Sequence, residues 1–187
     1  MKSEGSGSAA ARQLAETELY RAGTTDAVTR LPSRLFFIDV LKIVLEQSRR
    51  MKAPGTFVMI LLDGAWIAQE GEHHDRVAGA IARVLRRLTR NTDIVSRLAA
   101  DRFGLYLTGT DLAGAKIFVE RLRSGIAVAS KALGTAGPVQ ACFGVAEAGG
   151  SAYRIGLLLQ SADRAASQSK LVGAGVTSVA SSHRTRA

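Results

Sequence analysis

The sequence has few of the residues that mark a disulfide scaffold, a membrane protein or a base-stacking surface. Among its 187 residues there is one cysteine, Cys142, so no internal disulfide can form. It lies in an apolar stretch, where we expect a buried, unreactive thiol. Aromatic residues make up only 5% of the chain, which argues against a platform for DNA or RNA bases. Because no apolar run suits a membrane span or a signal peptide, we expect a cytoplasmic protein.

Positive charge is what the chain has in excess. Lys and Arg number 25 against 16 Asp and Glu, which gives a formal net charge of +9 at pH 7. This balance suits an anionic partner such as a nucleotide, a nucleic acid or an anionic surface. A basic, soluble surface without any ligand explains it equally well. The length and a hydrophobic content of 47% predict one domain with an ordinary core.

Helix and strand patterns alternate along the chain. We expect residues 1–23 to comprise a Gly/Ser-rich start and a lead-in helix over 11–22. The domain is then expected over residues 24–181, followed by a basic tail over 182–187. The patterns predict helices over 34–50, 76–89, 111–129 and 152–169, and strands over 56–62, 94–98, 103–107, 138–146 and 176–180. A tight turn at 99–101 predicts a hairpin. The expected fold class is α+β, with helices flanking a central mixed, mainly antiparallel sheet.

Charged residues beside the strands are the first candidates for a site. Asp63 ends the most apolar strand, a usual place for a ligand or metal. Asp101 and Arg102 lie at the hairpin tip, where they can meet a ligand. The segment 65–75 is expected to be irregular and carries a group of Glu and His residues. Zinc is one interpretation of that group, but we favour helix caps and solvated loop residues.

Four motifs follow one another from residue 26 onward. They are Asp26-Ala-Val-Thr29-Arg-Leu31-Pro-Ser33-Arg34, the strand ending in Leu61-Leu62-Asp63, the turn Ala99-Ala100-Asp101-Arg102-Phe103, and Phe143-Gly144-Val145-Ala146 with the helix that ends near Lys170. In this order they resemble the motifs of the GGDEF family, the diguanylate cyclase domain of bacterial signalling. The resemblance implies a GGDEF, nucleotidyl-cyclase-like fold for nearly all of the chain.

The resemblance also indicates a damaged catalytic site. The family joins two GTP molecules with two metal ions, in a dimer with one GTP in each half. At the hairpin, Ala99 and Ala100 replace glycines that let a triphosphate approach closely. Arg102 stands in place of a metal-side acid, and Ala65 in place of a second Asp. We therefore expect no catalysis and no bound metal. The surviving catalytic positions are isolated remnants: Asp63, Asp101 and Lys170.

A second site implied by the resemblance is intact. Arg90-Asn-Thr-Asp93 has the spacing from the hairpin of the family's allosteric product site, and Arg121 matches a further arginine of that site. The product is cyclic di-GMP. An arginine can bind guanine O6 and N7, and a carboxylate can accept hydrogen bonds from guanine N–H groups. The alternative is that both arginines are solvated helix residues and that Asp93 is common in relatives without the site.

These observations lead to three functional hypotheses. The first is a catalytically inactive receptor that binds cyclic di-GMP through Arg90, Asp93 and Arg121 and thereby controls a homodimer or a partner protein, without binding DNA or RNA. The second is a protein-interaction module that needs no nucleotide and docks through the lead-in helix and the basic helix 76–90. The third is a weak cyclase that still uses Asp63 and Asp101.

Overall fold

The computed structural model describes residues 23–63, 72–134, 139–149, 153–173 and 177–180. Its elements are α2 (Arg34–Met51), β1 (Gly55–Asp63), α3 (Glu72–Leu88), β2 (Ile94–Ala99), β3 (Arg102–Thr108), α4 (Leu112–Leu133), β4 (Gln140–Glu147), α5 (Ile155–Val172) and β5 (Thr177–Val179). Every helix and strand expected within these ranges is present. The lead-in helix expected over 11–22, the segment 65–71 and the tail 182–187 lie outside the described residues.

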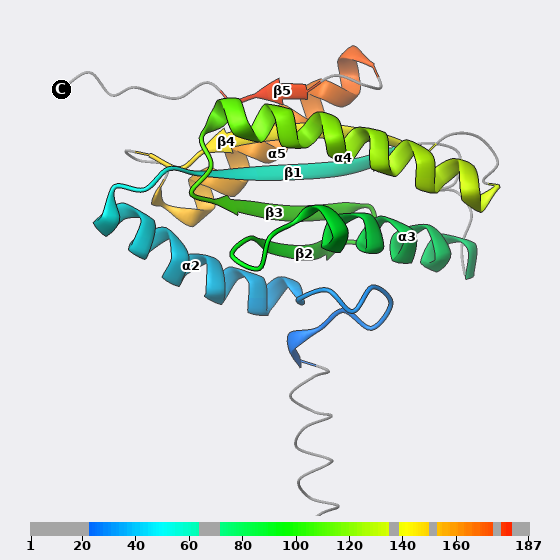
Figure 1. Cartoon of the computed structure of the whole chain (residues 1–187), viewed down its shortest axis with the longest axis horizontal. Helices are drawn as coiled ribbons and strands as arrows, with labels where there is room; N and C mark the ends of the chain where they lie inside the picture. Colours follow the sequence, from blue (N-terminus) through cyan, green and yellow to red (C-terminus); the bar gives the residue numbers. More distant parts are fainter. Residues whose placement is uncertain (1–22, 64–71, 135–138, 150–152, 174–176, 181–187) are drawn as a thin grey trace, which may run out of the picture.

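The sheet confirms the expected mixed, mainly antiparallel arrangement. Its strand order is β2-β3-β1-β4-β5 (Figure 1). The pairs β2–β3, β3–β1 and β1–β4 are antiparallel, whereas β4–β5 is parallel. Val58 in the central strand β1 lies opposite Leu105 of β3 and Val145 of β4. None of the described helices is long and apolar enough to cross a membrane.

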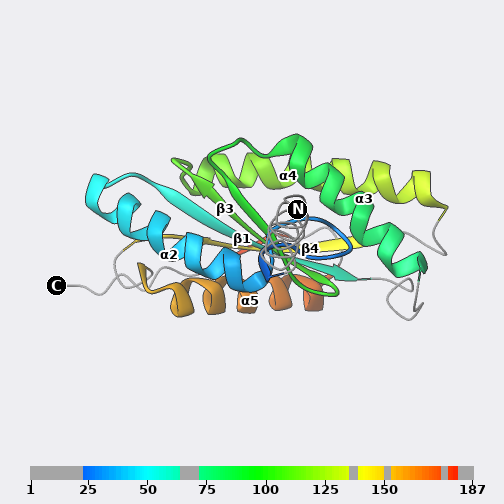
Figure 2. The same cartoon turned by 90° about the horizontal axis from the view of Figure 1, so that it is seen from below.

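Helices cover both faces of the sheet, α3 and α4 on one side and α2 and α5 on the other (Figure 2). Successive side chains of β1 enter two separate cores, because side chains alternate across a strand. Val58, Ile60 and Leu62 pack with α3 and α4. The intervening Met59 and Leu61 pack with α2 and α5 on the other side. The unbroken apolar run of β1 follows from this double burial.

The helix α3 begins earlier than the sequence predicts. Residues 72–75 were expected to be irregular, and this expectation is wrong, since Glu72 is the first residue of α3. Glu72 and Asp75 provide negative charge in the first turn, where it stabilises a helix N-terminus. Within the described ranges, no group of three or more His, Cys, Asp or Glu side chains could hold a metal ion. The zinc interpretation therefore has no support in that part of the chain.

Gly144 in β4 marks the closest approach of a helix to the sheet. A Cβ at this position would collide with the carbonyl oxygen of Ala162 and the amide nitrogen of Ala166, both in the backbone of α5. Glycine is needed here because it alone lets the helix backbone pack directly on the strand. This contact fixes the position of α5 on the sheet.

Asp26 ties the opening motif to the hairpin. Its Oδ1 accepts hydrogen bonds from the Thr29 amide at 2.7 Å and from the Thr29 hydroxyl at 2.6 Å. The largely buried Arg97 of β2 places Nη1 3.4 Å from the same oxygen. Burial raises the pKa of Asp26, but the hydrogen bonds from Thr29 and the charge of Arg97 outweigh burial and lower the pKa below its ordinary value.

We expect the ionised form of Asp26 to stabilise the fold. A lowered folded-state pKa contributes stability above the unfolded pKa of about 4, and this contribution is lost as the pH falls through the folded-state value. Asp26→Asn should therefore cost roughly 1–3 kcal/mol at pH 7 and progressively less below about pH 4. Urea denaturation across this pH range measures the difference. Asp39→Asn, which removes an exposed ion pair with Lys42, is the control and should cost little. A cost of Asp26→Asn that does not change with pH would contradict the expectation.

Candidate functional site

The hairpin tip lies beside the end of β1. The turn of Ala99, Ala100 and Asp101 joins β2 to β3, and the pairing is irregular between Arg97 and Ala99. Arg97 Nη2 donates a hydrogen bond to the carbonyl of Ala100 at 3.1 Å. The carbonyl of Asp101 accepts one from the amide of Leu62 at 2.9 Å. This last bond brings the tip next to Asp63.

Ion pairs join the tip to α5. Arg102 Nη1 lies 2.7 Å from Asp163 Oδ1, and Arg102 Nε lies 3.7 Å from Asp101 Oδ1. Lys170 Nζ lies 3.2 Å from Asp63 Oδ1. We call these five residues the tip cluster. The structure thus pairs Asp63 directly with Lys170, while Asp101 pairs with Arg102. Sequence reasoning did not include Asp163, although it lies in the Ala162-Asp-Arg-Ala165 stretch of the predicted last helix.

A second group of polar residues forms the turn between α3 and β2. Asp93 Oδ2 accepts a hydrogen bond from the Arg90 amide at 2.8 Å, and Oδ1 accepts one from the Thr108 amide at 3.2 Å. The Asp93 amide donates to the Arg90 carbonyl at 3.0 Å, and the Thr108 hydroxyl donates to the Thr92 carbonyl at 2.8 Å. Asp93 therefore closes the turn and ties it to the end of β3. The sequence comparison did not reveal this structural role, which is typical of Asp in turns.

The side chains of Arg90 and Arg121 are both exposed. The helices α3 and α4 run antiparallel (Figure 1). A Cβ on Gly125 of α4 would lie 2.8 Å from Val84 and 3.6 Å from Leu88 of α3. Arg121 lies one turn before Gly125 on the same side of α4, so it faces the C-terminal end of α3, where Arg90 follows. Neither guanidinium forms an ion pair with another residue that the structure describes.

Comparison with known families decides the identity of the fold. Residues 23–175 match the family described as diguanylate cyclase, GGDEF domain. The chain belongs to the GGDEF family. The expected GGDEF-like fold is confirmed.

Known relatives support this assignment. The GGDEF domain is 30% identical over 108 residues to the diguanylate cyclase DgcP of Pseudomonas aeruginosa, an alignment that covers 55% of this chain and 16% of that protein. The chain spans between 10% and 20% of the length of the curated relatives it matches. These relatives are thus much longer proteins, of which this GGDEF chain resembles one part.

Solved structures share the fold over most of the chain. The GGDEF domain of DgcB from Caulobacter crescentus, solved in complex with c-di-GMP, has a TM-score of 0.76 and 19% identity and covers 84% of this chain and 95% of that chain. The diguanylate cyclase SiaD of Pseudomonas aeruginosa, solved with its activator SiaC, has a TM-score of 0.76 and 26% identity. That alignment covers 92% of this chain and 69% of SiaD.

The tip cluster of this GGDEF domain does not fit a metal site. A divalent cation needs several oxygen ligands whose negative charge is available to it. Here Lys170 already lies against Asp63, and the guanidinium of Arg102 lies between Asp101 and Asp163. A metal ion would have to displace Lys170 from Asp63 and would be repelled by the positive charge of Arg102.

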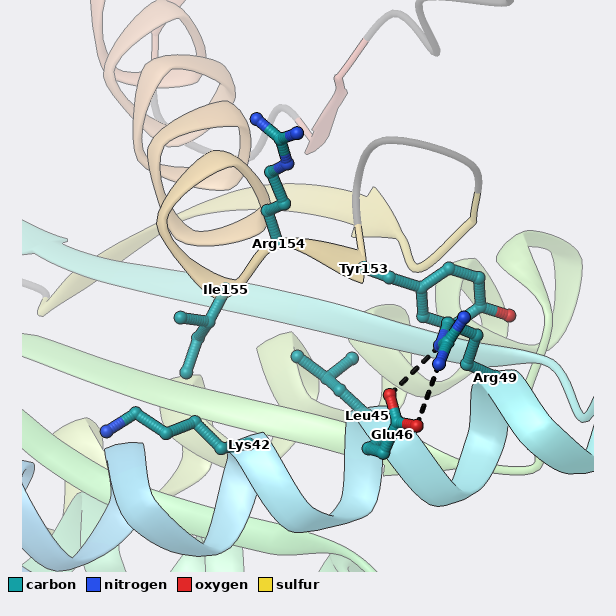
Figure 3. Close-up of a pocket in the computed structure, with 7 residues that line it drawn as sticks. All are labelled: Lys42, Leu45, Glu46, Arg49, Tyr153, Arg154 and Ile155. Carbon is teal, nitrogen blue, oxygen red and sulfur yellow. Dashed lines mark hydrogen bonds and ion pairs between the residues drawn. The ribbon is translucent and has the colours of Figure 1, made fainter.

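A shallow pocket between α2 and the start of α5 is a further feature that sequence reasoning missed (Figure 3). Glu46 lies on its α2 side and accepts hydrogen bonds from Arg49 at 2.8 and 2.9 Å and from Arg50 at 3.0 Å. Hydrogen bonds from these two arginines lower the pKa of Glu46 to about 2. Glu46 and Arg49 pair with each other. Among the described lining residues this leaves Arg154 and Lys42 as cations, and Lys42 pairs with Asp39.

Proposed function

We propose that this GGDEF domain is a catalytically inactive receptor for cyclic di-GMP, which binds at Arg90, Asp93 and Arg121. The observation that carries the proposal is the exposed Arg90 in the turn closed by the Asp93 carboxylate, together with the exposed Arg121 on the neighbouring helix α4, both without ion-pair partners in the described ranges. Each guanidinium can bind a guanine edge or a phosphate in bidentate fashion. Cyclic di-GMP offers both groups.

Asp93 keeps acceptor capacity in this arrangement. Each of its carboxylate oxygens accepts one backbone hydrogen bond, from Arg90 or from Thr108, and an ionised carboxylate has about four acceptor sites in all. The remaining sites suit the N1–H and N2–H groups of guanine. The turn also fixes the backbone of Arg90, which reduces the entropy lost when a ligand binds. The DgcB GGDEF domain in complex with c-di-GMP supports a dinucleotide ligand for this fold.

The tip cluster supports the absence of catalysis. A two-metal reaction needs its ligands together and uncompensated, whereas here Asp63 and Asp101 are paired with cations. Incubation with GTP and Mg²⁺ or Mn²⁺, followed by chromatography, tests this part. We expect no dinucleotide product, and any product would support the weak-cyclase hypothesis. Neither metal nor another cofactor is part of the proposal.

Isothermal titration with cyclic di-GMP tests the receptor function. We expect wild-type binding and a loss of about tenfold or more in affinity for Arg90→Ala, because one bidentate arginine contact to guanine is worth about 1–3 kcal/mol. Arg76→Ala is the matched control, since Arg76 is an exposed arginine near the opposite end of α3. Undetectable wild-type binding, or equal binding by Arg90→Ala, would refute the proposal. Light scattering with and without the ligand reports whether binding changes a homodimer.

A nucleotide-independent interaction module is the second candidate. It is favoured by one observation, the row of exposed arginines along α3. The solved complex of SiaD with its activator SiaC is an example of a family member that binds a protein partner. This candidate predicts a partner protein in a pull-down and no thermal shift with cyclic di-GMP, GTP or GDP.

A further inference from the structure

One side of α3 carries a row of exposed arginines. Arg76, Arg83 and Arg87 project from the helix, and Arg90 continues the row from the following turn. At 100° per residue, Arg76, Arg83 and Arg87 fall within about 40° around the helix axis and span about 16 Å along it, and Arg90 lies just beyond the helix end, which brings these arginines to four. We call them the arginine face. All four are exposed.

The acidic residues of α3 are confined to its first turn, where Glu72 lies one turn before Arg76. The sequence contains no Asp or Glu between Asp75 and Asp93. In the described part of the chain, the arginine face makes no ion pair, and Glu120 of α4 pairs instead with Arg123. Arg83 and Arg87 are four residues apart within α3, a spacing at which like charges destabilise a helix.

Arg86 gives a useful contrast on the same helix. Its Nη2 donates a hydrogen bond of 2.7 Å to the Thr29 carbonyl, so Arg86 holds the opening motif against α3. The arginine face has no comparable role inside the domain. Its charges repel one another and serve no described contact, which is the pattern expected of a surface that meets an anionic partner.

The surroundings of the face indicate which anionic partner fits. None of the exposed large hydrophobic side chains of the described residues lies on α3, so the face lacks the apolar residues that an interfacial helix inserts into a membrane. Gly79 lies beside the row between Arg76 and Arg83, and a Cβ there would meet only Arg83 Nη1, at 3.8 Å. The backbone of another helix can therefore approach closely. DNA contacts usually add Ser, Thr, Asn or Gln side chains; α3 itself contains none of these, and Thr89 and Asn91 flank Arg90 only beyond its end.

We propose that the arginine face docks an acidic helix of a partner protein, and that cyclic di-GMP competes with this helix for Arg90. Carboxylates on one side of a helix repeat with the same three- and four-residue spacing as the arginines, and arginine binds carboxylates in bidentate pairs. Arg90 belongs to both surfaces, so the two ligands exclude each other there. The competition rests on the proposed function, whereas the docking of the acidic helix does not.

Fluorescence anisotropy with a labelled helical peptide tests the proposal on the full chain. The probe is a synthetic 21-residue peptide whose glutamates lie on one side of the helix. The control has the same composition, with the glutamates spread around the helix. We expect binding of the first peptide at physiological salt, at least fivefold weaker binding of the control, and displacement by cyclic di-GMP. Equal binding of both peptides would mean general charge attraction and would overturn the docking proposal.

Two variants separate this inference from the proposed function. Arg76→Ala should weaken peptide binding at least threefold and leave cyclic di-GMP binding unchanged, while Arg90→Ala should weaken both. Peptide binding without any cyclic di-GMP binding would refute the receptor and the competition but support the docking. Cyclic di-GMP binding without displacement of the peptide would refute the competition alone. If a 20-base-pair DNA or vesicles containing phosphatidylserine bind and the peptide does not, the docking proposal is wrong.

Discussion

Arg102→Glu should make the fold respond to divalent cations that leave the wild-type chain unchanged. The substitution removes the ion pair to Asp163 and adds a carboxylate beside Asp101 and Asp163, near Asp63. Of the two cations of the tip cluster, Lys170 then remains beside its four acidic groups. Without metal, we expect a loss of about 1–2 kcal/mol, because these groups are partly exposed and water screens their repulsion.

Added Mg²⁺ or Mn²⁺ should reverse this loss. A cation at 100 times its Kd stabilises the form that binds it by about 2.7 kcal/mol. For a chain of this size, that energy raises the Tm by roughly 5–10 °C. Differential scanning calorimetry in EDTA and in 10 mM Mg²⁺ measures the effect. Arg102→Gln is the matched control, since it removes the same ion pair without adding a ligand, and it should not respond. A similar response of wild type, Arg102→Gln and Arg102→Glu would contradict this account of the tip.

Gly144→Ala should strongly destabilise the fold. The new Cβ would overlap backbone atoms of Ala162 and Ala166, and a helix backbone cannot yield as a flexible side chain can. The helix α5 must move away from β4, at a cost of about 2–3 kcal/mol. Urea denaturation monitored by circular dichroism measures this cost.

Gly149→Ala is the control for that measurement, because a Cβ at Gly149 has nothing within 4 Å among the described residues. We expect it to change stability by less than about 0.5 kcal/mol. If both variants had the same stability, the close packing of α5 on β4 would be wrong. The displacement of α5 should also separate Arg102 from Asp163, since Asp163 follows Ala162 in the helix. The absence of a side chain at Gly144 is therefore needed to keep Asp163 of α5 within reach of Arg102.

Much of the fold could be predicted because strands and helix caps are specified by residues that are close together in the sequence. The run from Thr56 to Leu62 identified a strand buried on both faces. Ser33, a residue type favoured at helix N-termini, directly precedes α2, and its hydroxyl accepts a hydrogen bond from the Phe36 amide. The sequence did not predict the start of α3, because Glu72 and the residues after it are polar. A helix is recognised in a sequence by its apolar periodicity, which this first turn lacks.

The site was harder to predict because its contacts join distant parts of the chain. The pairing of Arg102 with Asp163 depends on where α5 lies over the sheet, and no local pattern contains that information. The motif comparison located Arg90 and Asp93 but did not reveal that the Asp93 carboxylate binds the Thr108 amide. Ligand binding by Arg90, Asp93 and Arg121 stays a prediction.

The hydrogen bond from Thr108 to Asp93 makes one backbone amide a natural reporter of this region. The Thr108 amide lies at the end of β3, yet its acceptor is the carboxylate that also closes the turn at Arg90. Opening of that turn exposes this amide to solvent without unfolding the sheet. Hydrogen exchange at Thr108 can therefore follow the order of the turn in the unlabelled protein, separately from the stability of the fold as a whole.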